Sequence, residues 1–315
     1  MTTTISAGPL VPLETPTPER RRFDLLSTVP ITEPKNDRWL GGAWTGGEVP
    51  GPAFTHDPCS DGTDRIKMAP GVVETQKSKR FTVYLPGFCQ AKAIGPDPGF
   101  WTDKLARVFE VYESAAVERA LATGDGHLDI GPFICDQNLE LLNAGQPTSA
   151  AVGYALLEQA IARHGTGILH IGLRTFAAWH SFLVPGSDPM RTKLGTPVVI
   201  GYGYVNARPE NADPFGEGQE WAFATGPIQV IRDREIDIVP GPSYTEALDR
   251  ETNDALFIAE RPYLLNWMAR QSPTDDDHIQ AGVLIEQGGF EDVIVIDTEG
   301  NIHIRVGASV IADLS

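Results

Sequence analysis

Residues 102–122, with the sequence TDKLARVFEVYESAAVERALA, carry the strongest helix pattern in this chain. Thr102 is a good cap for the first turn, and Gly124 stands where helices commonly end in a left-handed glycine. Apolar residues recur at spacings of three and four, which predicts one buried face made of Leu105, Val108, Phe109, Tyr112, Ala116 and Ala120. Much of the opposite face carries Lys104, Arg107, Glu110, Glu113 and Glu118. At about 1.5 Å per residue, the helix would be about 31 Å long and could act as a structural spine.

The sequence on either side of this helix predicts a mixture of strands and helices. Before the helix, Phe81–Leu85 has the β-branched and aromatic content of a strand. After it, the chain alternates, with helices expected at 149–163 and 174–183 and strands at 167–171 and 197–200. Such alternation indicates a small α/β layer. Further strands are expected at 221–225, 228–239 and 255–259, and a terminal hairpin at 293–297 and 301–305. The fold class predicted from these elements is α+β.

The first hundred residues differ in composition from the rest of the chain. They contain 13 Pro and 11 Gly, which disfavour long helices. The same segment holds the large aromatic residues Trp39, Trp44 and Phe54, which are costly to leave in water. We therefore expect an extended arm that lies against a surface, either of its own chain or, as we favour, of a neighbouring subunit.

The overall composition excludes several classes of protein. The 315 residues are 41% hydrophobic and 21% charged, as is ordinary for a soluble protein. The formal net charge of −17 argues against a protein that reads DNA sequence. Three cysteines cannot make a disulfide framework, and no run approaches about 18 apolar residues, so no membrane span is expected. Residues 1–10 lack the basic and apolar segments of a secretory signal.

Charge is distributed unevenly along the chain. Residues 205–300 hold 6 Lys and Arg against 20 Asp and Glu, a net charge of −14, which is most simply a solubilising face. A modest basic cluster precedes the predicted spine and consists of Arg65, Lys67, Lys77, Lys79, Arg80 and Lys92. We expect this cluster to pair with the acidic region of a neighbouring copy, with non-specific contact to nucleic acid as the alternative. The candidate intersubunit contacts are therefore Trp39, Trp44, Phe54, Arg65, Lys67, Lys77, Lys79 and Arg80.

A search for reactive motifs identifies no catalytic residue, no cofactor-binding residue and no metal ligand. The three cysteines are separated by 30 and 46 residues, which is not zinc-ligand spacing. Gly201-Tyr-Gly203 lacks the third glycine of a dinucleotide loop and is interpreted as a bend between strands. His170 falls within an apolar strand, where a hydrogen-bonded core histidine is the expected role. Residues 275–278, Asp-Asp-Asp-His, lack the glycine and terminal glutamate of a calcium loop and indicate a solvated turn.

Several stretches together resemble the major capsid proteins of tailed phages, in the form carried by phages of actinobacteria. They are FTVYL at 81–85 followed by Cys89, ESAAVERALATG at 113–124, GILHIGLRTFAAW at 167–179, LGTPVVIGYGY at 194–204, WAFATGPIQV at 221–230, and ALDRETN at 247–253 through Glu260-Arg261. The resemblance covers roughly residues 81–270 and consists of packing patterns rather than reactive residues.

The resemblance implies the Hong Kong 97-like capsid fold, with an N-terminal arm, an extended β-loop, a peripheral domain containing the spine helix, and an axial α/β domain. The implied divisions are the extended arm at 1–58, the extended loop and lead-in strand at 59–100, the peripheral domain with the spine helix at 101–147, the axial domain at 148–226, the return strands of the peripheral domain at 227–275, and a C-terminal β-hairpin extension at 276–315.

The resemblance further implies a major capsid protein that self-assembles into hexamers and pentamers of an icosahedral phage head around double-stranded DNA. The expected partners are other copies of the chain, the portal and scaffold or other head proteins, and packaged DNA bound without sequence preference, with no membrane and no cofactor. The expected location is the virion capsid, after assembly in the host cytoplasm. Two alternatives remain open: an encapsulin-like compartment shell, and an α/β enzyme whose site combines scattered residues such as His170, His180 and Asp188.

Overall fold

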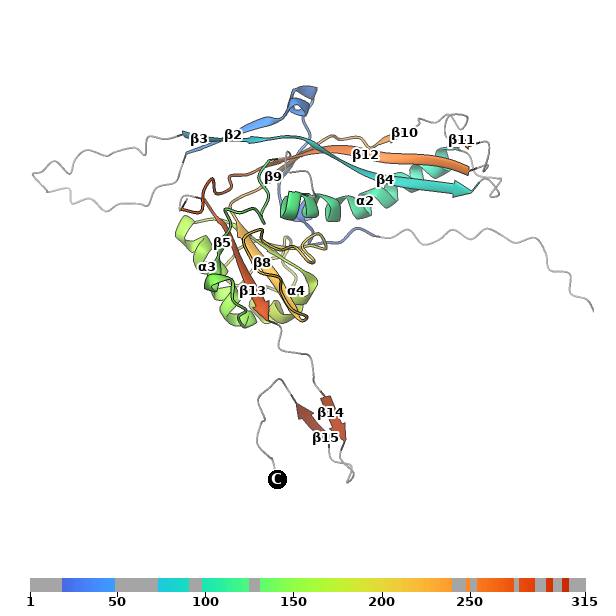
Figure 1. Ribbon diagram of the computed structural model, residues 1–315. Coiled ribbons are helices and arrows are strands. Elements are labelled where there is room, and N and C mark those ends of the chain that lie inside the picture. The colour runs from blue at the N-terminus through green and yellow to red at the C-terminus, as the bar shows by residue number, and fades with distance from the viewer. Residues whose placement is uncertain are drawn as a thin grey trace, which may run out of the picture.

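The computed structural model of the chain describes residues 19–48, 73–90, 98–124, 131–239, 248–249, 254–274, 278–286, 293–296 and 302–305. Of the candidate contact residues, Phe54, Arg65 and Lys67 lie outside these ranges. The described residues build one sheet along a long helix and a second sheet that contacts two shorter helices (Figure 1).

The long helix, α2 (Pro98–Thr123), is the predicted spine and begins four residues earlier than expected. A proline suits the first turn because its missing N–H has no partner there anyway. Gly124 has a φ of +70° and ends the helix, as expected. The predicted apolar face is largely buried, although Tyr112 is 56% exposed. Glu113 and Glu118, which the sequence pattern placed on the polar face, are both buried and hydrogen-bonded.

The sheet along α2 is built around one long strand, β12. Its members are β1 (Ile31–Thr32), β4 (Phe81–Gln90), β9 (Gln229–Arg232), β10 (Asp237–Val239), β11 (Leu248–Asp249) and β12 (Asp254–Asn266). The strands run in the order β1-β9-β12-β10, and both β4 and β11 also pair with β12. Val83, Phe257 and Tyr263 belong to the same core cluster as Phe109 of α2. Tyr84, which directly follows Val83 in β4, is 67% exposed. This alternation is that of a sheet covered on one face.

The second sheet has the strand order β5-β13-β8-β6-β7. Its strands are β5 (Glu140–Leu141), β6 (Ile168–Ile171), β7 (Val198–Ile200), β8 (Gln219–Thr225) and β13 (Gln280–Glu286). The helices beside it, α3 (Ala150–His164) and α4 (Leu173–Trp179), confirm the predicted alternation of helix and strand. Ser149 caps α3 through its hydroxyl, which accepts from the Val152 N–H, and Gly165 ends the helix with a φ of +90°.

Two strands differ from the sequence expectation. The single strand expected at 228–239 is divided into β9 and β10, which pair with different parts of β12. Residues 280–286, which the sequence analysis placed in a C-terminal extension, form β13 in the interior of the second sheet. A strand buried on both faces shows no alternation of polar and apolar residues, so the usual strand pattern is missing there.

Two hairpins complete the described residues. Strands β2 (Ala43–Glu48) and β3 (Val73–Ser78) pair antiparallel, and so do β14 (Val293–Ile296) and β15 (Ile302–Arg305). The second pair confirms the terminal hairpin expected from sequence. Near the start of the described chain lie the short helix α1 (Leu25–Thr28) and a 3-10 turn at Asp37–Gly41. No helix in the described ranges is long and apolar enough to cross a membrane.

Candidate functional site on the spine helix

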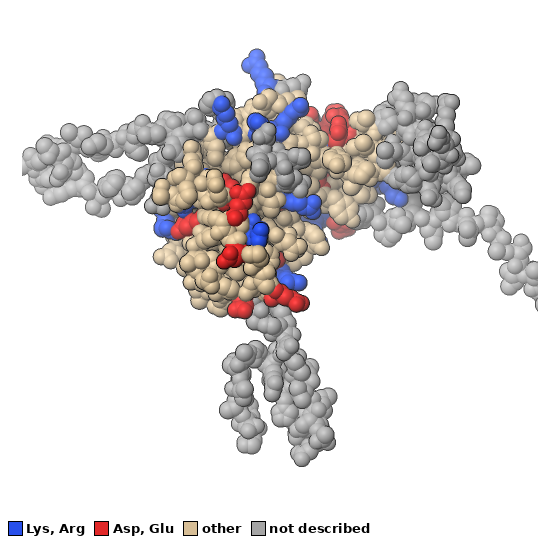
Figure 2. Space-filling view, in the orientation of Figure 1, with Lys and Arg blue, Asp and Glu red and all other residues tan. Residues whose placement is uncertain are grey.

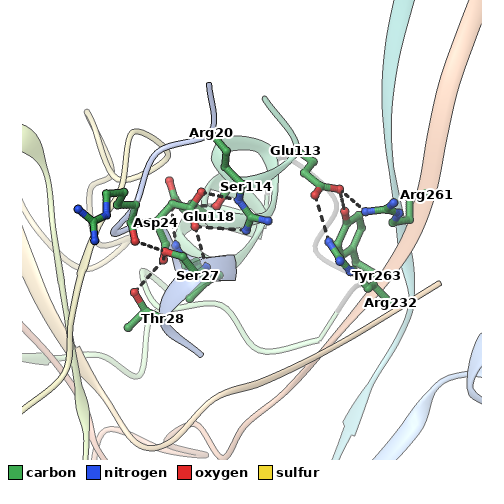
Figure 3. Close-up of polar contacts among 12 residues, drawn as sticks. Arg20, Asp24, Ser27, Thr28, Glu113, Ser114, Glu118, Arg232, Arg261 and Tyr263 are labelled. Carbon is green, nitrogen blue, oxygen red and sulfur yellow. Dashed lines mark hydrogen bonds and ion pairs between the residues drawn. The ribbon is translucent and has the colours of Figure 1, made fainter. Parts of the chain in front are cut away.

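The first buried carboxylate of the spine helix, Glu113, ties α2 to the sheet beside it. Its Oε1 accepts a hydrogen bond from Arg232 Nη1 at 3.1 Å, and its Oε2 accepts one from Arg261 Nη1 at 2.8 Å. The hydroxyl of Tyr263 also donates to Oε2 (Figure 3). Burial beside this carboxylate raises the pKa of Tyr263, so the phenol keeps its proton and remains a donor.

The Glu113 network reaches the N-terminal part of the chain through Arg232. This guanidinium also donates to the Glu33 carboxylate, with Nη2 at 3.1 Å from Oε1. Glu33 directly follows β1, so one arginine links the end of β1, strand β9 and the spine helix. A buried ion pair with further hydrogen bonds can hold elements in register, although it adds little net stability over an apolar contact.

The second buried carboxylate, Glu118, joins α2 to two other segments. Its Oε1 accepts from the backbone N–H of Leu25 at 3.0 Å, and its Oε2 accepts from that of Gly203 at 3.0 Å. The Ser114 hydroxyl donates to Oε1 at 3.4 Å. Burial raises the pKa of Glu118 to about 7, and its hydrogen bonds offset part of this effect.

Glu113 and Glu118 point to different sides of the spine helix. Five residues correspond to a rotation of about 140° around a helix axis. Figure 3 shows the two clusters on either side of α2, with the arginines around Glu113 and the N-terminal segment around Glu118. The helix is therefore attached on one side to the sheet and on the other to the N-terminal segment and to the loop that follows β7.

Two glycines let the 201–205 loop approach the spine helix closely. A Cβ atom on Gly203 would lie 2.4 Å from Glu118 Cβ and 2.5 Å from the Arg119 backbone nitrogen. A Cβ on Gly201 would lie 2.5 Å from Glu118 Oε2. The Gly-Tyr-Gly sequence was interpreted as a bend between strands, and in the structure it follows β7 and packs against α2.

The N-terminal segment is held by its own helix cap as well as by Glu118. Asp24 accepts from the Ser27 N–H at 2.7 Å and is paired with Arg20 at 3.2 Å. Leu25 and Leu26 are buried, and the Phe23 carbonyl accepts from the Ile200 N–H at 2.7 Å. The segment around α1 thus contacts both the spine helix and the edge strand β7 of the second sheet.

Five of the residues proposed as intersubunit contacts lie in the described ranges, in or next to the β2–β3 hairpin. They are Trp39, Trp44, Lys77, Lys79 and Arg80. Trp39 is 9% exposed within the single chain. Trp44 in β2 pairs with Lys77 in β3, and Lys77, Lys79 and Arg80 are exposed. Figure 2 shows Lys and Arg side chains gathered over the upper part of the body, where Figure 1 places β2, β3 and β12.

His170 is a hydrogen-bonded core residue, as the sequence analysis expected. Its Nε2 donates to the Thr225 hydroxyl at 2.8 Å, because that hydroxyl donates in turn to the Gly226 carbonyl. Its Nδ1 lies 2.9 Å from the Tyr204 hydroxyl and accepts from it. Burial lowers the pKa of His170 to about 3, so the ring is neutral.

The other two residues of the scattered-enzyme alternative have different partners. His180 is exposed, and its Nδ1 lies 3.0 Å from the Ala177 carbonyl oxygen. Asp188 is exposed and lies 3.6 Å from Arg22. The contacts of the described residues therefore give that alternative no assembled site.

The buried carboxylates of α2 are the features that sequence reasoning missed. Arg261, which donates to Glu113, lies 148 residues from it in the sequence. Leu25, which donates to Glu118, lies 93 residues from it. Helical periodicity cannot reveal such distant partners. The one available signal was the Gly-Tyr-Gly sequence, whose glycines mark a close backbone approach.

Comparison with known proteins finds similar structures but no similar sequences. No family model matches the chain, and no curated protein matches it by sequence. The capsid of an empty GTA particle superposes with a TM-score of 0.51 at 10% identity, over 89% of this chain and 95% of that one. The capsid of Ralstonia phage GP4 gives a TM-score of 0.51 at 9% identity, over 90% and 97% of the two chains. A chain of Mycobacterium phage Bobi gives 0.50 at 10% identity, over 86% and 92%. The chain therefore has the Hong Kong 97-like capsid fold that its sequence resemblance implied.

Proposed function

We propose that this chain is a major capsid protein that self-assembles into hexamers and pentamers of an icosahedral phage head enclosing double-stranded DNA. The observation that carries the proposal is the structural match to capsid chains over most of their length. For Ralstonia phage GP4 the match covers 90% of this chain and 97% of the capsid chain. The sequence resemblance over roughly residues 81–270 points independently to the same role.

The distribution of charge supports contact between copies through the β2–β3 hairpin. Lys77, Lys79 and Arg80 are exposed at the end of this hairpin. The acidic region of the chain presents exposed carboxylates at Glu210, Asp213, Glu217, Glu235 and Asp237. Complementary patches on one subunit favour head-to-tail association, which closes into rings when the rotation between copies allows it. Trp44, Phe54, Arg65 and Lys67 belong to the same proposed contact.

The two carboxylates of the spine helix suit a shell subunit. A subunit in a shell transmits force between neighbours, so its helix, sheet and N-terminal segment need fixed connections. Glu113 and Glu118 supply these connections through side-chain and backbone donors on both sides of α2. Their role in the proposal is to keep the shape of the subunit, with no part in chemical catalysis.

The remaining partners follow from the proposed role. A phage head also contains a portal and commonly uses a scaffold or other head proteins, and we propose these as partners together with packaged DNA bound without sequence preference. An acidic subunit fits this role because protein–protein contacts, rather than tight DNA binding, would retain the genome. The proposed location is the virion capsid, after assembly in the host cytoplasm.

Electron microscopy of the purified full-length protein tests the proposal. Closed shells or capsomer rings are expected, with double-stranded DNA inside particles isolated from their natural source. A protein that stays a discrete monomer in every assembly condition would contradict the proposal. Particles that contain a protein cargo and no genome, as judged by mass spectrometry and nucleic-acid analysis, would instead favour the encapsulin-like compartment.

A further inference from the structure

We propose that the free edge of strand β4 is a contact surface for a second copy of this chain, whose own β4 adds to the sheet as an antiparallel strand. The contact joins two copies around a two-fold axis and needs no closed shell, so it goes beyond the proposed function. Either proposal can therefore fail while the other stands.

Strand β4 is the one long strand that the described residues leave at an edge of the two large sheets. Among the described strands only β12 pairs with it, in one register from Phe81 to Gln90 (Figure 1). The other edge strands are short, with two residues in β1, β5 and β11 and three in β7 and β10. Strand β7 is also covered, since its Ile200 N–H donates to the Phe23 carbonyl.

The hydrogen bonds of β12 show which backbone groups of β4 face outward. Pro262 of β12 lies opposite Thr82, and its carbonyl accepts from the Asp233 N–H, on the β9 side of β12. Residues directly opposite each other in an antiparallel pair either exchange hydrogen bonds or both point away from each other. Thr82 therefore points its N–H and C=O to the free edge. Because this direction alternates along a strand, Tyr84 and Pro86 point the same way.

The sequence of β4 leaves this edge open to another strand. Residues 81–90, FTVYLPGFCQ, include no charged side chain. Thr82 and Tyr84 are both exposed, with Tyr84 at 67%. Natural proteins usually protect such an edge with charges, prolines or a covering segment, because an uncharged edge recruits other strands. Pro86 has no N–H, so it limits the open edge to the residues before it.

A second β4 fits this edge because the strand is complementary to itself around Val83. With a two-fold axis at Val83, Thr82 of each copy lies opposite Tyr84 of the other, and each such pair exchanges two hydrogen bonds. No outward N–H or C=O of these two residues then lacks a partner. Their side chains meet on the exposed face as an aromatic residue beside a β-branched one, which is a favourable cross-strand pair.

The flanking charges favour the antiparallel arrangement. Lys79 and Arg80 directly precede β4. In the two-fold pairing they lie opposite Gly87 and Pro86 of the other copy, so no like charges meet. A parallel pairing in register would instead place the two basic residues beside the same residues of the second chain, which is unfavourable.

Amide hydrogen exchange of the full-length protein, resolved to single residues, tests the direction of the edge. In a single copy the Thr82 and Tyr84 N–H groups face water, whereas those of Val83 and Leu85 face β12. We expect Thr82 and Tyr84 to exchange at least about 10-fold more slowly when about 90% of the copies are paired by raising the protein concentration. Val83 and Leu85 are internal controls and should change little.

Two variants with the same residue at position 84 test the occupant. In Thr82→Lys/Tyr84→Glu, each introduced lysine faces a glutamate of the other copy, whereas in Thr82→Glu/Tyr84→Glu glutamates face each other. Both variants place a glutamate beside Glu260 of β12, so they differ only at position 82. Sedimentation velocity should give a dimer Kd at least about 10-fold weaker for the all-glutamate variant. Circular dichroism checks that both are folded.

A mixture of two variants that each repel themselves gives the sharpest result. Thr82→Lys/Tyr84→Lys should pair as poorly as Thr82→Glu/Tyr84→Glu when each is alone. Mixed in equal amounts, the two should form dimers with a Kd close to that of Thr82→Lys/Tyr84→Glu, because every cross-strand pair then joins opposite charges.

Several results would overturn the proposal. They are a wild-type protein without paired copies, equal Kd values for the two matched variants, and a mixture that does not recover pairing, which would mean that another segment lies on β4. Slow exchange of Thr82 and Tyr84 already in the monomer would show that the same chain covers the edge. Closed shells in which both residues still exchange fast would remove this contact and leave the shell proposal standing, whereas dimers that never form shells would do the reverse.

Discussion

The guanidinium of Arg261 lies 2.8 Å from the carboxylate of Glu113, and the two side chains are only 4% and 1% exposed. Arg261 belongs to β12 and Glu113 to α2, so this pair joins the centre of the sheet to the middle of the spine helix. Loss of one partner breaks the ion pair and leaves the other charge buried with less compensation, whereas loss of both together removes the buried pair.

Arg261→Ala should therefore destabilise the subunit by about 3 kcal/mol, because Glu113 remains buried with only Arg232 as its ionic partner. Chemical denaturation of the unassembled subunit measures the change. Arg234→Ala removes an exposed arginine nearby and should change the free energy of unfolding by less than about 0.5 kcal/mol. Equal effects of the two substitutions would show that the buried pair is not structurally important.

Gly203→Ala should destabilise the subunit by about 1–3 kcal/mol, since the new methyl group would overlap the backbone of α2. The added Cβ would lie 2.5 Å from the Arg119 nitrogen, and helix backbone cannot easily move away. The control is Gly41→Ala, whose Cβ would meet nothing within 4 Å. Thermal unfolding should separate the two variants, and a Gly203→Ala protein as stable as Gly41→Ala would contradict the close approach.

The buried neutral His170 should make the subunit less stable in acid. Burial lowers its folded-state pKa from 6.5 to about 3, so the unfolded chain binds a proton there that the folded chain does not. The contribution of His170 to stability is complete above the unfolded value and is lost as the pH falls below it, by about 1.4 kcal/mol per pH unit.

The pH dependence of chemical denaturation, compared between wild type and His170→Gln, isolates this contribution. The variant should unfold with a weaker acid dependence between about pH 6.5 and about pH 4. His180→Gln changes an exposed histidine and should keep the wild-type slope. Identical slopes for wild type and His170→Gln would mean that His170 does not titrate as its burial requires.

Charge reversal at Lys77, Lys79 and Arg80 should slow assembly while leaving the subunit folded. The proposed contact is between exposed charges, so its effect should weaken as salt shortens the Debye length to about 8 Å at 0.15 M. Light scattering follows assembly, and circular dichroism checks the fold. If the two patches meet, adding Glu235→Lys and Asp237→Lys to the reversed protein should restore assembly. The pairing is refuted if neither this variant nor reversal at Glu210, Asp213 and Glu217 restores assembly.

Local patterns in the sequence were sufficient to predict much of this fold. Helix α3 carries its own cap at Ser149 and its own stop at Gly165, so its position needs no distant information. The apolar strand around His170 likewise indicated a core residue with satisfied nitrogens. The fold as a whole was predicted from the resemblance to a known family. Each packing pattern is weak alone, but several of them in one chain point to the same family.

The parts that could not be predicted depend on distant contacts. Glu113 and Glu118 were placed on the polar face of the helix. A helical pattern records only that glutamate is polar and does not show whether a distant partner compensates its charge. Their donors come from α1, β9, β12 and the 201–205 loop, which only the folded chain brings together. Strand β13 was missed for a related reason, since its burial on both faces removes the alternation that marks a strand.

The pairing of β12 with β4 also has a mechanical consequence. Its antiparallel pairing with β4 extends over ten consecutive residue pairs, from Asp254 with Gln90 to Tyr263 with Phe81. The hydrogen bonds of such a ladder lie perpendicular to the strands. A pull along the strand axis therefore strains all of these bonds together, in shear, instead of opening them one after another from an end. If the chain forms the proposed shell, internal pressure that stretches the subunit along β12 would act along its strongest direction.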